Sequence, residues 1–249
     1  MNLKKYDKNG KLLNLTPIAD KQNIPTYYDW WIKNPDRYDP TLEDLKSELQ
    51  LTALGDFELL NFNIEWEKFN QEIKKFTLVP YLRRENVSND REGLLLVGLP
   101  NDTPTDSLSR PEAIKRAGKM LEETDFNIPT KAFSEFPSLS EILNYWNPLG
   151  RTMIIKTNAG GWFPPHRDNP HLTRDTFRIV VFLGNATNYE SYEWILNNKT
   201  QAIIPNQAYY IDTRKVHRTH SWINDSYHLI LNVPKTWENV IKLMSRLKY

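Results

Sequence analysis

The chain has 249 residues, enough for one large domain or two small ones. Its 32 basic and 31 acidic residues give a net charge of +1, so no overall field favours nucleic acid or an anionic membrane as a partner. Cysteine is absent, which excludes disulfides and thiolate metal sites and leaves His, Asp and Glu to bind any metal.

The first 150 residues predict several helices and one buried strand. Thr41 precedes a segment with acidic residues in its first turn, the pattern of a capped helix N-terminus. Apolar residues recur at helical spacing from Trp66 to Phe76, and this stripe is expected to pack on a sheet. Ser138 and Glu141 have capping-box spacing. We expect helices over 41–50, 64–76, 112–123 and 138–146, and a strand over the apolar run 93–100.

From Arg151 onward the sequence predicts strand after strand. The runs are short, rich in β-branched and aromatic residues, and separated by Gly, Pro, Asn or Asp, which is typical of a double-sheet jelly roll. Thr236 can cap a final helix with one apolar face. The expected strands cover 152–159, 176–184, 192–198, 201–205, 207–213 and 227–233.

These patterns predict a mainly β (α+β) chain that forms a single domain over 1–249. Residues 1–150 would be a mixed α/β supporting region, 151–234 the jelly-roll catalytic core, and 235–249 a C-terminal helix. No internal repeat, low-complexity tract or linker divides the sequence.

The stretch WFPPHRD predicts a pair of metal ligands. In an extended chain, His166 and Asp168 point to the same face. A surface ion pair and a chance His-x-Asp are the alternatives at this point. KVHRTH follows about fifty residues later and offers His217 and His220, which differ in strand parity, so one of the two is expected to face inward. Two histidines and one carboxylate are typical of non-haem Fe(II) sites with open coordination positions.

Arg178 lies inside TFRIVVFLG, a strand that is apolar on both faces. A buried guanidinium needs an anion, because an unpaired buried charge is prohibitive. The anion could be a protein carboxylate, such as Asp175 or Asp212, or the carboxylate of a small acid held by the guanidinium fork. The sequence leaves both alternatives open.

Three blocks together resemble a known family. GRTMIIKTNAGGWFPPHRD, DTFRIVVFLGN, and YYIDTRKVHRTHSW with SYHLILNVP resemble the aspartyl/asparaginyl β-hydroxylase-like branch of the Fe(II)/2-oxoglutarate-dependent oxygenases. The likeness spans about 150–234, with a weaker echo in REGLLLVGL and DFNIPT. It implies a double-stranded β-helix core, a cupin-like jelly roll, with flanking helices.

The resemblance also implies roles for particular residues. His166, Asp168 and His217 would be catalytic and would bind iron, with His220 as the alternative distal ligand. Arg178 would contact 2-oxoglutarate, and Thr157 would line the same pocket.

The sequence departs from the family's pattern in two ways. Vertebrate-type aspartyl hydroxylases lack the acidic ligand that Asp168 supplies. They also carry a second arginine on the strand after the distal histidine, where this chain has Ser226, Tyr227 or His228. The second departure leaves open which residue completes the 2-oxoglutarate pocket.

The resemblance implies a hydroxylase with Fe(II), the cosubstrate 2-oxoglutarate and O2, which acts on an amino-acid, peptidyl or small-metabolite C–H bond and releases succinate and CO2. A non-catalytic or metal-binding jelly-roll binding module is the alternative. Trp162, Trp222 and Arg214 are candidate walls of the substrate mouth, with packing as the other role of the tryptophans. The sequence shows no signal-peptide-like or membrane-spanning apolar run, so we expect a cytoplasmic protein without nucleic-acid or membrane partners.

Overall fold

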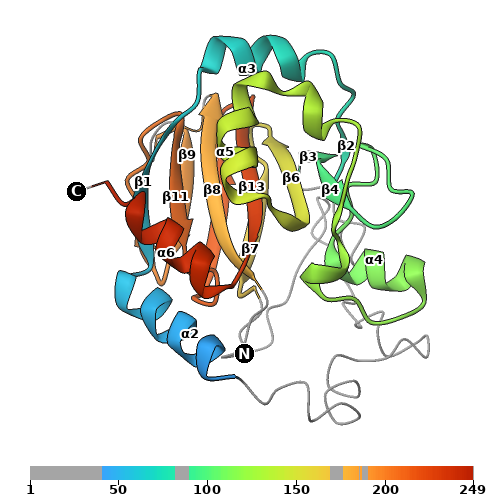
Figure 1. Cartoon of the computed structure of the whole chain (residues 1–249). Helices are drawn as coiled ribbons and strands as arrows, with labels where there is room; N and C mark the ends of the chain where they lie inside the picture. Colours follow the sequence, from blue (N-terminus) through green and yellow to red (C-terminus); the bar gives the residue numbers. More distant parts are fainter. Residues whose placement is uncertain (1–40, 82–89, 169–175, 185, 187–189, 249) are drawn as a thin grey trace, which may run out of the picture.

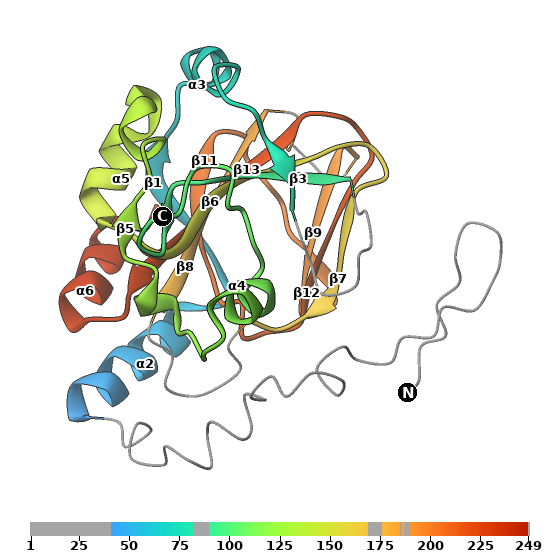
Figure 2. The same cartoon turned by 90° about the vertical axis from the view of Figure 1, so that its right-hand side faces the viewer.

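The computed structural model describes residues 41–81, 90–168, 176–184, 186 and 190–248. Within these residues the chain forms two stacked sheets with helices on one side (Figures 1 and 2). The larger, seven-stranded sheet has the order β1-β11-β8-β13-β6-β3-β2, and the smaller sheet has the order β10-β9-β12-β7. A short β4-β5 pair stands apart from both.

The strands are short, as the sequence predicts for a jelly roll. They are β1 (Phe57–Asn63), β2 (Val79–Pro80), β3 (Arg91–Leu95), β4 (Val97–Gly98), β5 (Ile128–Pro129), β6 (Leu149–Thr157), β7 (Trp162–His166), β8 (Thr176–Gly184), β9 (Tyr192–Leu196), β10 (Lys199–Thr200), β11 (Gln207–Ile211), β12 (His217–Ser221) and β13 (Ser226–Pro234).

The eight strands from β6 to β13 are divided between the two sheets in the manner of a double-stranded β-helix. β6, β8, β11 and β13 lie in the large sheet, and β7, β9, β10 and β12 form the small one. All neighbouring strands pair antiparallel. The expected mainly β, cupin-like jelly roll with flanking helices is therefore confirmed.

Strands from the first half of the chain extend the same large sheet. β1 pairs with β11 at one edge, and β3 pairs with β6 toward the other. In the second pairing Arg91 lies opposite Thr157, so these two side chains share a face of the sheet. The N-terminal half thus contributes residues to the inside of the jelly roll as well as the helices that cover it.

The helices lie mainly on the outer face of the large sheet. They are α2 (Leu42–Leu54), α3 (Trp66–Ile73), α4 (Arg110–Ala117), α5 (Ser140–Trp146) and α6 (Trp237–Ser245), with 3-10 turns η3 (Glu123–Asp125), η4 (Phe133–Glu135) and η5 (Pro137–Leu139). Figure 2 shows α2, α3, α5 and α6 on one side of the large sheet and the small sheet on the other.

The pleat of the large sheet separates two cores. Phe177, Ile179 and Val181 of β8 point toward the helices, where they join one apolar cluster. Val180 and Phe182 point the opposite way and pack with residues of the small sheet. Because Arg178 shares the face of Val180 and Phe182, its guanidinium is directed into the space between the sheets.

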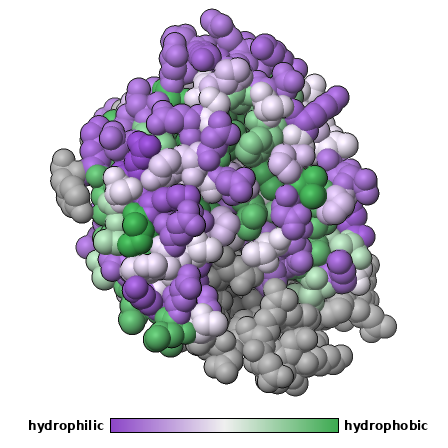
Figure 3. All heavy atoms as spheres, in the orientation of Figure 1, coloured by the Kyte–Doolittle hydropathy of each residue, from purple (hydrophilic) through white to green (hydrophobic). Residues whose placement is uncertain are grey.

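The helix-covered face is mainly hydrophilic, with small hydrophobic patches, one of them over α2 (Figure 3). Leu42, Leu45 and Leu49 are exposed along that helix. None of the helices in the described part of the chain combines the length and apolar character needed to cross a membrane.

Two predicted caps are confirmed and one is wrong. Thr41 accepts a hydrogen bond from Asp44 N at the start of α2, and Thr236 accepts one from Asn239 N at the start of α6. Ser138 caps nothing, because its hydroxyl and amide both bond to the carboxylate of Glu72, and α5 begins two residues later.

Three predicted elements also differ from the structure. The helix expected over 112–123 ends at Ala117, because Gly118 adopts a left-handed conformation (φ +66°) that closes the helix. The segment 201–205 is irregular and forms no strand. The strand that pairs with β9 is instead β10, at Lys199–Thr200. The run 93–100 is split into β3 and β4, which belong to different sheets.

Candidate metal centre

His166, Asp168 and His217 come together at one end of the small sheet. His166 is the last residue of β7 and His217 the first of β12, and the two are directly paired across the strands. The amide of Asp168 donates to the carbonyl of Thr213 (2.8 Å), which ties the turn after β7 to the chain just before His217. The three side chains each offer a ligand atom, and these atoms lie within 4.8 Å of one another.

Both imidazole rings are oriented by backbone carbonyls. His166 Nδ1 lies 2.8 Å from the carbonyl oxygen of Pro164, and His217 Nδ1 lies 3.0 Å from that of Lys215. A carbonyl can only accept, so each Nδ1 donates to it, and each Nε2 is the ring atom left to face a metal. The Nε2 atoms lie 3.5 and 3.6 Å from the oxygens of Asp168, on the side where the ligand atoms converge. A backbone carbonyl that holds the other ring nitrogen in this way is typical of histidines that bind a metal.

The carboxylate of Asp168 is held in its charged form. Burial would raise its pKa, but the charge of Arg178, the two histidines and Arg151 outweigh burial and hold the pKa well below its usual value. Oδ2 lies 2.9 Å from Arg178 Nη1 as an ion pair, yet it accepts no well-aligned hydrogen bond from the described residues. The donor set of two imidazoles and one carboxylate fits Fe(II), and it leaves coordination positions for other ligands.

The structure separates the two candidates for the distal histidine. His217 is buried on the inner face of β12, and its ring stacks on Trp194 (5.6 Å between centroids, 8° between planes). His220 has the opposite parity and lies against the ring of Trp222, 4.0 Å away. His217 is therefore the histidine that joins His166 and Asp168.

Arg178 is paired with a protein carboxylate, the first of the two alternatives that the sequence left open. Its partner is Asp168, and Arg178 Nε also donates to Asn232 Oδ1 (3.1 Å). Asp212 is engaged elsewhere, by Arg214 (2.8 Å). Asp175 lies outside the described residues. The guanidinium of Arg178 thus holds the Asp168 carboxylate in position through this ion pair.

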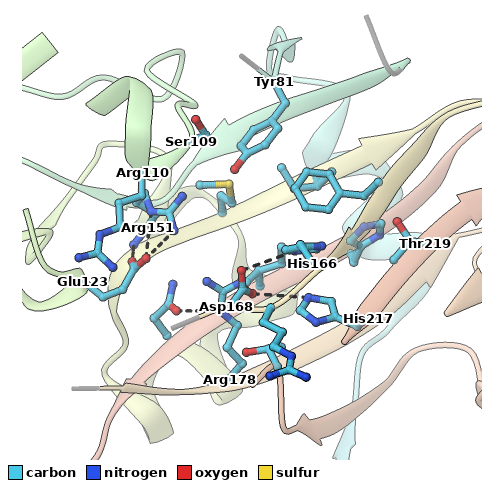
Figure 4. A pocket seen from close by; sticks show the side chains of 18 of the residues that line it. Tyr81, Ser109, Arg110, Glu123, Arg151, His166, Asp168, Arg178, His217 and Thr219 are labelled. Atoms are coloured by element: carbon cyan, nitrogen blue, oxygen red, sulfur yellow. Dashed lines mark hydrogen bonds and ion pairs between the residues drawn. The ribbon is translucent and has the colours of Figure 1, made fainter. Parts of the chain in front are cut away.

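The triad borders a cavity of about 430 Å³, within the range of small-molecule sites (roughly 300–1,000 Å³). Figure 4 shows Arg110, Arg151 and Glu123 on one side of the triad and Thr219 on the other. We call the first side the arginine end (Tyr81, Ser109, Arg110, Glu123, Arg151 and Asn232) and the second the inner end (Arg91, Phe163, Trp194, Thr219 and His228).

Arg91 places a cation in the inner end of the cavity, in addition to Arg178 beside the triad. The sequence analysis did not predict it. Its side chain is 7% exposed, and its guanidinium lies 4.3 Å from the ring centre of Phe163, which in turn lies 4.3 Å from that of His166. Burial, followed by the positive charge of Arg91, lowers the pKa of His228 to about 3, so His228 is neutral. Its Nε2 lies 3.1 Å from the hydroxyl of Tyr192. Arg91 lies in REGLLLVGL, a weaker part of the family resemblance that implied no role for this arginine.

The arginine end contains two Arg–Glu ion pairs, which the sequence analysis also did not predict. Arg110 Nη2 lies 2.8 Å from Glu122 Oε2. Arg151 donates to Glu123 through Nε (3.1 Å), through Nη2 and through its backbone amide (3.0 Å). No short motif marks these residues, because the pairs join α4, η3 and β6.

The remaining predicted residues lie elsewhere. Thr157 is fully buried at the inner end of β6 but is not among the residues that line the cavity, and its hydroxyl has no hydrogen-bond partner in the described part of the chain. Trp222 is 56% exposed, and neither it nor Trp162 lines the cavity. Arg214 does not wall the mouth, because Asp212 and Glu48 of α2 hold its guanidinium.

The Glu123–Arg151 pair predicts a pH-dependent contribution to stability. Burial opposes ionisation of Glu123, but Arg151 and the other arginines lower its pKa from 4.5 to about 2. A lowered pKa stabilises the folded state above pH 4.5, and this contribution is lost as the pH falls toward 2. We expect Glu123→Gln to lower the free energy of unfolding by about 3 kcal/mol at pH 7, and by much less at pH 3, in urea titrations.

Glu238→Gln is the matched control for that measurement. Glu238 forms an exposed i,i+4 pair with Lys242 (2.9 Å), so its loss should change the free energy of unfolding by no more than about 0.5 kcal/mol at either pH. An equal loss of stability in Glu123→Gln at pH 7 and pH 3 would contradict the assigned pKa.

Comparison with known proteins gives weak structural similarities only. No family model and no curated protein matches the sequence. A prolyl hydroxylase from Trichoplax adhaerens, solved with a peptide fragment of the hypoxia inducible factor oxygen degradation domain, is 15% identical, with 85% of this chain and 100% of that chain covered and a TM-score of 0.44. A 2OG-Fe(II) oxygenase family oxidoreductase from Burkholderia pseudomallei is 13% identical, with 80% and 93% covered and a TM-score of 0.43. A Pseudomonas putida prolyl-4-hydroxylase is 8% identical, with 76% and 98% covered and a TM-score of 0.41.

The class of protein therefore rests on the strand order and on the site. A double-stranded β-helix carries a His-x-Asp…His triad at the end of its small sheet, beside a cavity between the sheets. This chain thus has a cupin-like jelly-roll fold with a candidate iron-binding triad of two histidines and one carboxylate.

Proposed function

We propose that this protein is an Fe(II)- and 2-oxoglutarate-dependent dioxygenase that hydroxylates a C–H bond of an amino-acid, peptidyl or small-metabolite substrate. The observation that carries the proposal is the triad, in which two oriented imidazole Nε2 atoms and the Asp168 carboxylate converge beside a cavity with buried cations. Bound together, Fe(II) and 2-oxoglutarate would supply oxidising chemistry that side chains lack, with O2 as oxidant and succinate and CO2 as products.

The protein's part would be to hold and orient these groups. His166, Asp168 and His217 would bind Fe(II), and Arg178 would keep the Asp168 carboxylate ionised and in place. Arg178 would also lie beside the cosubstrate's chelating end, since its Nη1 is 2.9 Å from a ligand oxygen. Phe163 and Trp194 pack against the two histidine rings and would exclude water from the metal.

The inner end offers a replacement for the family's second arginine. Of the three residues near the strand position in question, His228 lines the cavity, but it is neutral and lies within hydrogen-bonding distance of Tyr192. Arg91 reaches the same end of the cavity from β3, a strand outside the eight of the jelly roll. We propose that Arg91 pairs with the distal carboxylate of 2-oxoglutarate.

The closer relationship to the aspartyl/asparaginyl β-hydroxylase-like branch is also a proposal. The three sequence blocks that resemble this branch contain β6 with β7, β8, and β11 to β13. Asp168 completes a facial triad that the vertebrate enzymes of that branch lack. The chain would then be a member with an ordinary two-histidine, one-carboxylate site.

Anaerobic titration with Fe(II) and 2-oxoglutarate tests the function. A weak visible charge-transfer band that requires both additions, and succinate formation that requires Fe(II) and O2, are the expected results. A non-catalytic jelly-roll binding module would give neither signal. The absence of the band with the metal demonstrably bound would reject the oxygenase function.

A further inference from the structure

The arginine end of the cavity presents donors rather than acceptors. Its acids are already engaged: Glu123 accepts three hydrogen bonds from Arg151, and Glu122 accepts one from Arg110. The hydroxyls of Tyr81 and Ser109 lie on the same side of the cavity (Figure 4). A ligand that enters here therefore meets side chains that can donate hydrogen bonds.

Asn232 provides the donor whose orientation is best defined. Its Oδ1 accepts from Arg178 Nε (3.1 Å), and because an arginine can only donate, this contact fixes which way the amide points. The Nδ2 group is buried and has no hydrogen-bond partner in the described part of the chain, although the residue is only 1% exposed. A buried donor left without a partner is unfavourable, and this penalty is recovered when a ligand acceptor meets the donor.

The backbone at Gly150 allows Asn232 to pack closely against the arginine end. Gly150, at the start of β6, has φ +68°, a conformation that favours glycine. A Cβ at this position would lie 2.8 Å from Asn232 Cγ and 2.9 Å from Glu123 Oε2. The missing side chain thus allows Asn232 and the Glu123–Arg151 pair to approach one another.

The charge of the loaded cavity favours an anion. Among the described residues, five arginines line it (Arg91, Arg110, Arg151, Arg167 and Arg178), against Glu123 and Asp168 in the lining and Glu122 beside Arg110. A divalent metal and a doubly charged cosubstrate would cancel each other, so arginines would still outnumber carboxylates among these described residues. The primary substrate is therefore expected to carry negative charge.

We infer that the arginine end recognises a carboxylate of the primary substrate, with Asn232 Nδ2 and the guanidinium groups of Arg110 and Arg151 as its donors. The inference rests on the proposed oxygenase function, which it deepens by naming the substrate class as a carboxylic acid. The carboxylate can belong to a free small acid or to an acidic side chain of a peptide, and the two sources are separated by experiment.

Ligand-observed saturation-transfer NMR on the full-length protein, loaded with Zn(II) and N-oxalylglycine, measures this preference without turnover. The probes are carboxylic-acid metabolites, each paired with its primary amide, and N-acetyl aspartate and glutamate methylamides paired with their asparagine and glutamine counterparts. We expect at least one acid to bind about tenfold or more tightly than its amide. Preference within the metabolite pairs identifies a free acid, and preference within the methylamide pairs identifies a peptidyl side chain.

Asn232→Asp is the decisive variant. It keeps an oxygen facing Arg178 Nε but replaces the donor with an anionic acceptor, so the preference for acids should be lost while N-oxalylglycine still binds. Equal binding of acids and amides, no binding of any acid, or an unchanged preference in Asn232→Asp would each overturn the inference. Failure of N-oxalylglycine to bind the Zn(II)-loaded wild type would instead reject the oxygenase function itself.

Discussion

Replacing His166 with alanine is expected to abolish turnover of 2-oxoglutarate and to weaken metal binding at the triad by more than about 100-fold. The variant removes one of the two imidazoles and leaves the Asp168 carboxylate facing a single histidine. Losing even an outer-shell partner of a metal ligand typically costs 10- to 100-fold in affinity, so losing a ligand should cost more. Titration calorimetry with Mn(II) under anaerobic conditions measures the affinity, and succinate release measures turnover.

His220→Ala is the matched control for that experiment. His220 lies on the same strand as His217, but its ring faces away from the triad and packs against Trp222. The control should keep metal affinity and turnover within a few-fold of wild type. Retained turnover in His166→Ala, or loss of metal binding in His220→Ala, would show that the metal does not sit at the triad.

The jelly roll was predictable because each of its main strands is marked by residues within the strand and at its ends. Each of the strands β6, β8, β11 and β13 coincides with a short apolar run bounded by Gly, Pro, Asn or Asp, and the pleat makes side-chain direction a matter of parity. Parity also placed His166 and Asp168 on one face and indicated that only one of His217 and His220 could point inward. Which of the two does so followed from the register of β12 with β7.

The failed predictions are places where a distant partner overrides a local signal. Ser138 has the spacing of a capping box, but the carboxylate of Glu72, 66 residues earlier, binds its hydroxyl and amide instead. The run 201–205 has strand composition, yet it forms no strand, and its first residue, Gln201, only extends the β9–β10 pairing by one backbone bond to Trp194 (2.9 Å). Propensity cannot reveal such outcomes, since they depend on which elements meet in the fold.

The arginines of the cavity were hidden for the same reason. Arg110 and Arg151 each pair with an acid from η3 or the residue before it, and Arg91 joins the site only because β3 extends the large sheet beside β6. Nothing in the sequence around Arg91 distinguishes it from a solvated charge at the edge of an apolar run. Its function depends on the register that places it opposite Thr157 on the inner face.

Replacing Arg91 with glutamine is expected to weaken binding of the 2-oxoglutarate analogue N-oxalylglycine by about 100-fold or more. Arg91 carries a buried positive charge. Its guanidinium lies 4.3 Å from the ring centre of Phe163, and that ring centre lies 4.3 Å from the ring centre of His166. An extended five-carbon chain spans about 5 Å between its end carbons, so a diacid chelated at the triad can bring its far carboxylate toward Arg91. Removing one partner of a buried charge pair typically costs 3–5 kcal/mol.

Calorimetric titration of the Mn(II)-loaded protein with N-oxalylglycine gives the affinity, and titration with Mn(II) alone tests whether the triad is intact. Arg91→Lys keeps the charge but loses the planar fork, so it should restore part of the affinity. Lys156→Gln is the matched control, because Lys156 lies on β6 next to Thr157 but points to the opposite face, toward Asp225 (3.0 Å). If Arg91→Gln bound both Mn(II) and N-oxalylglycine as wild type does, the distal carboxylate would lie elsewhere, and Arg178 would remain as its cationic partner at the triad.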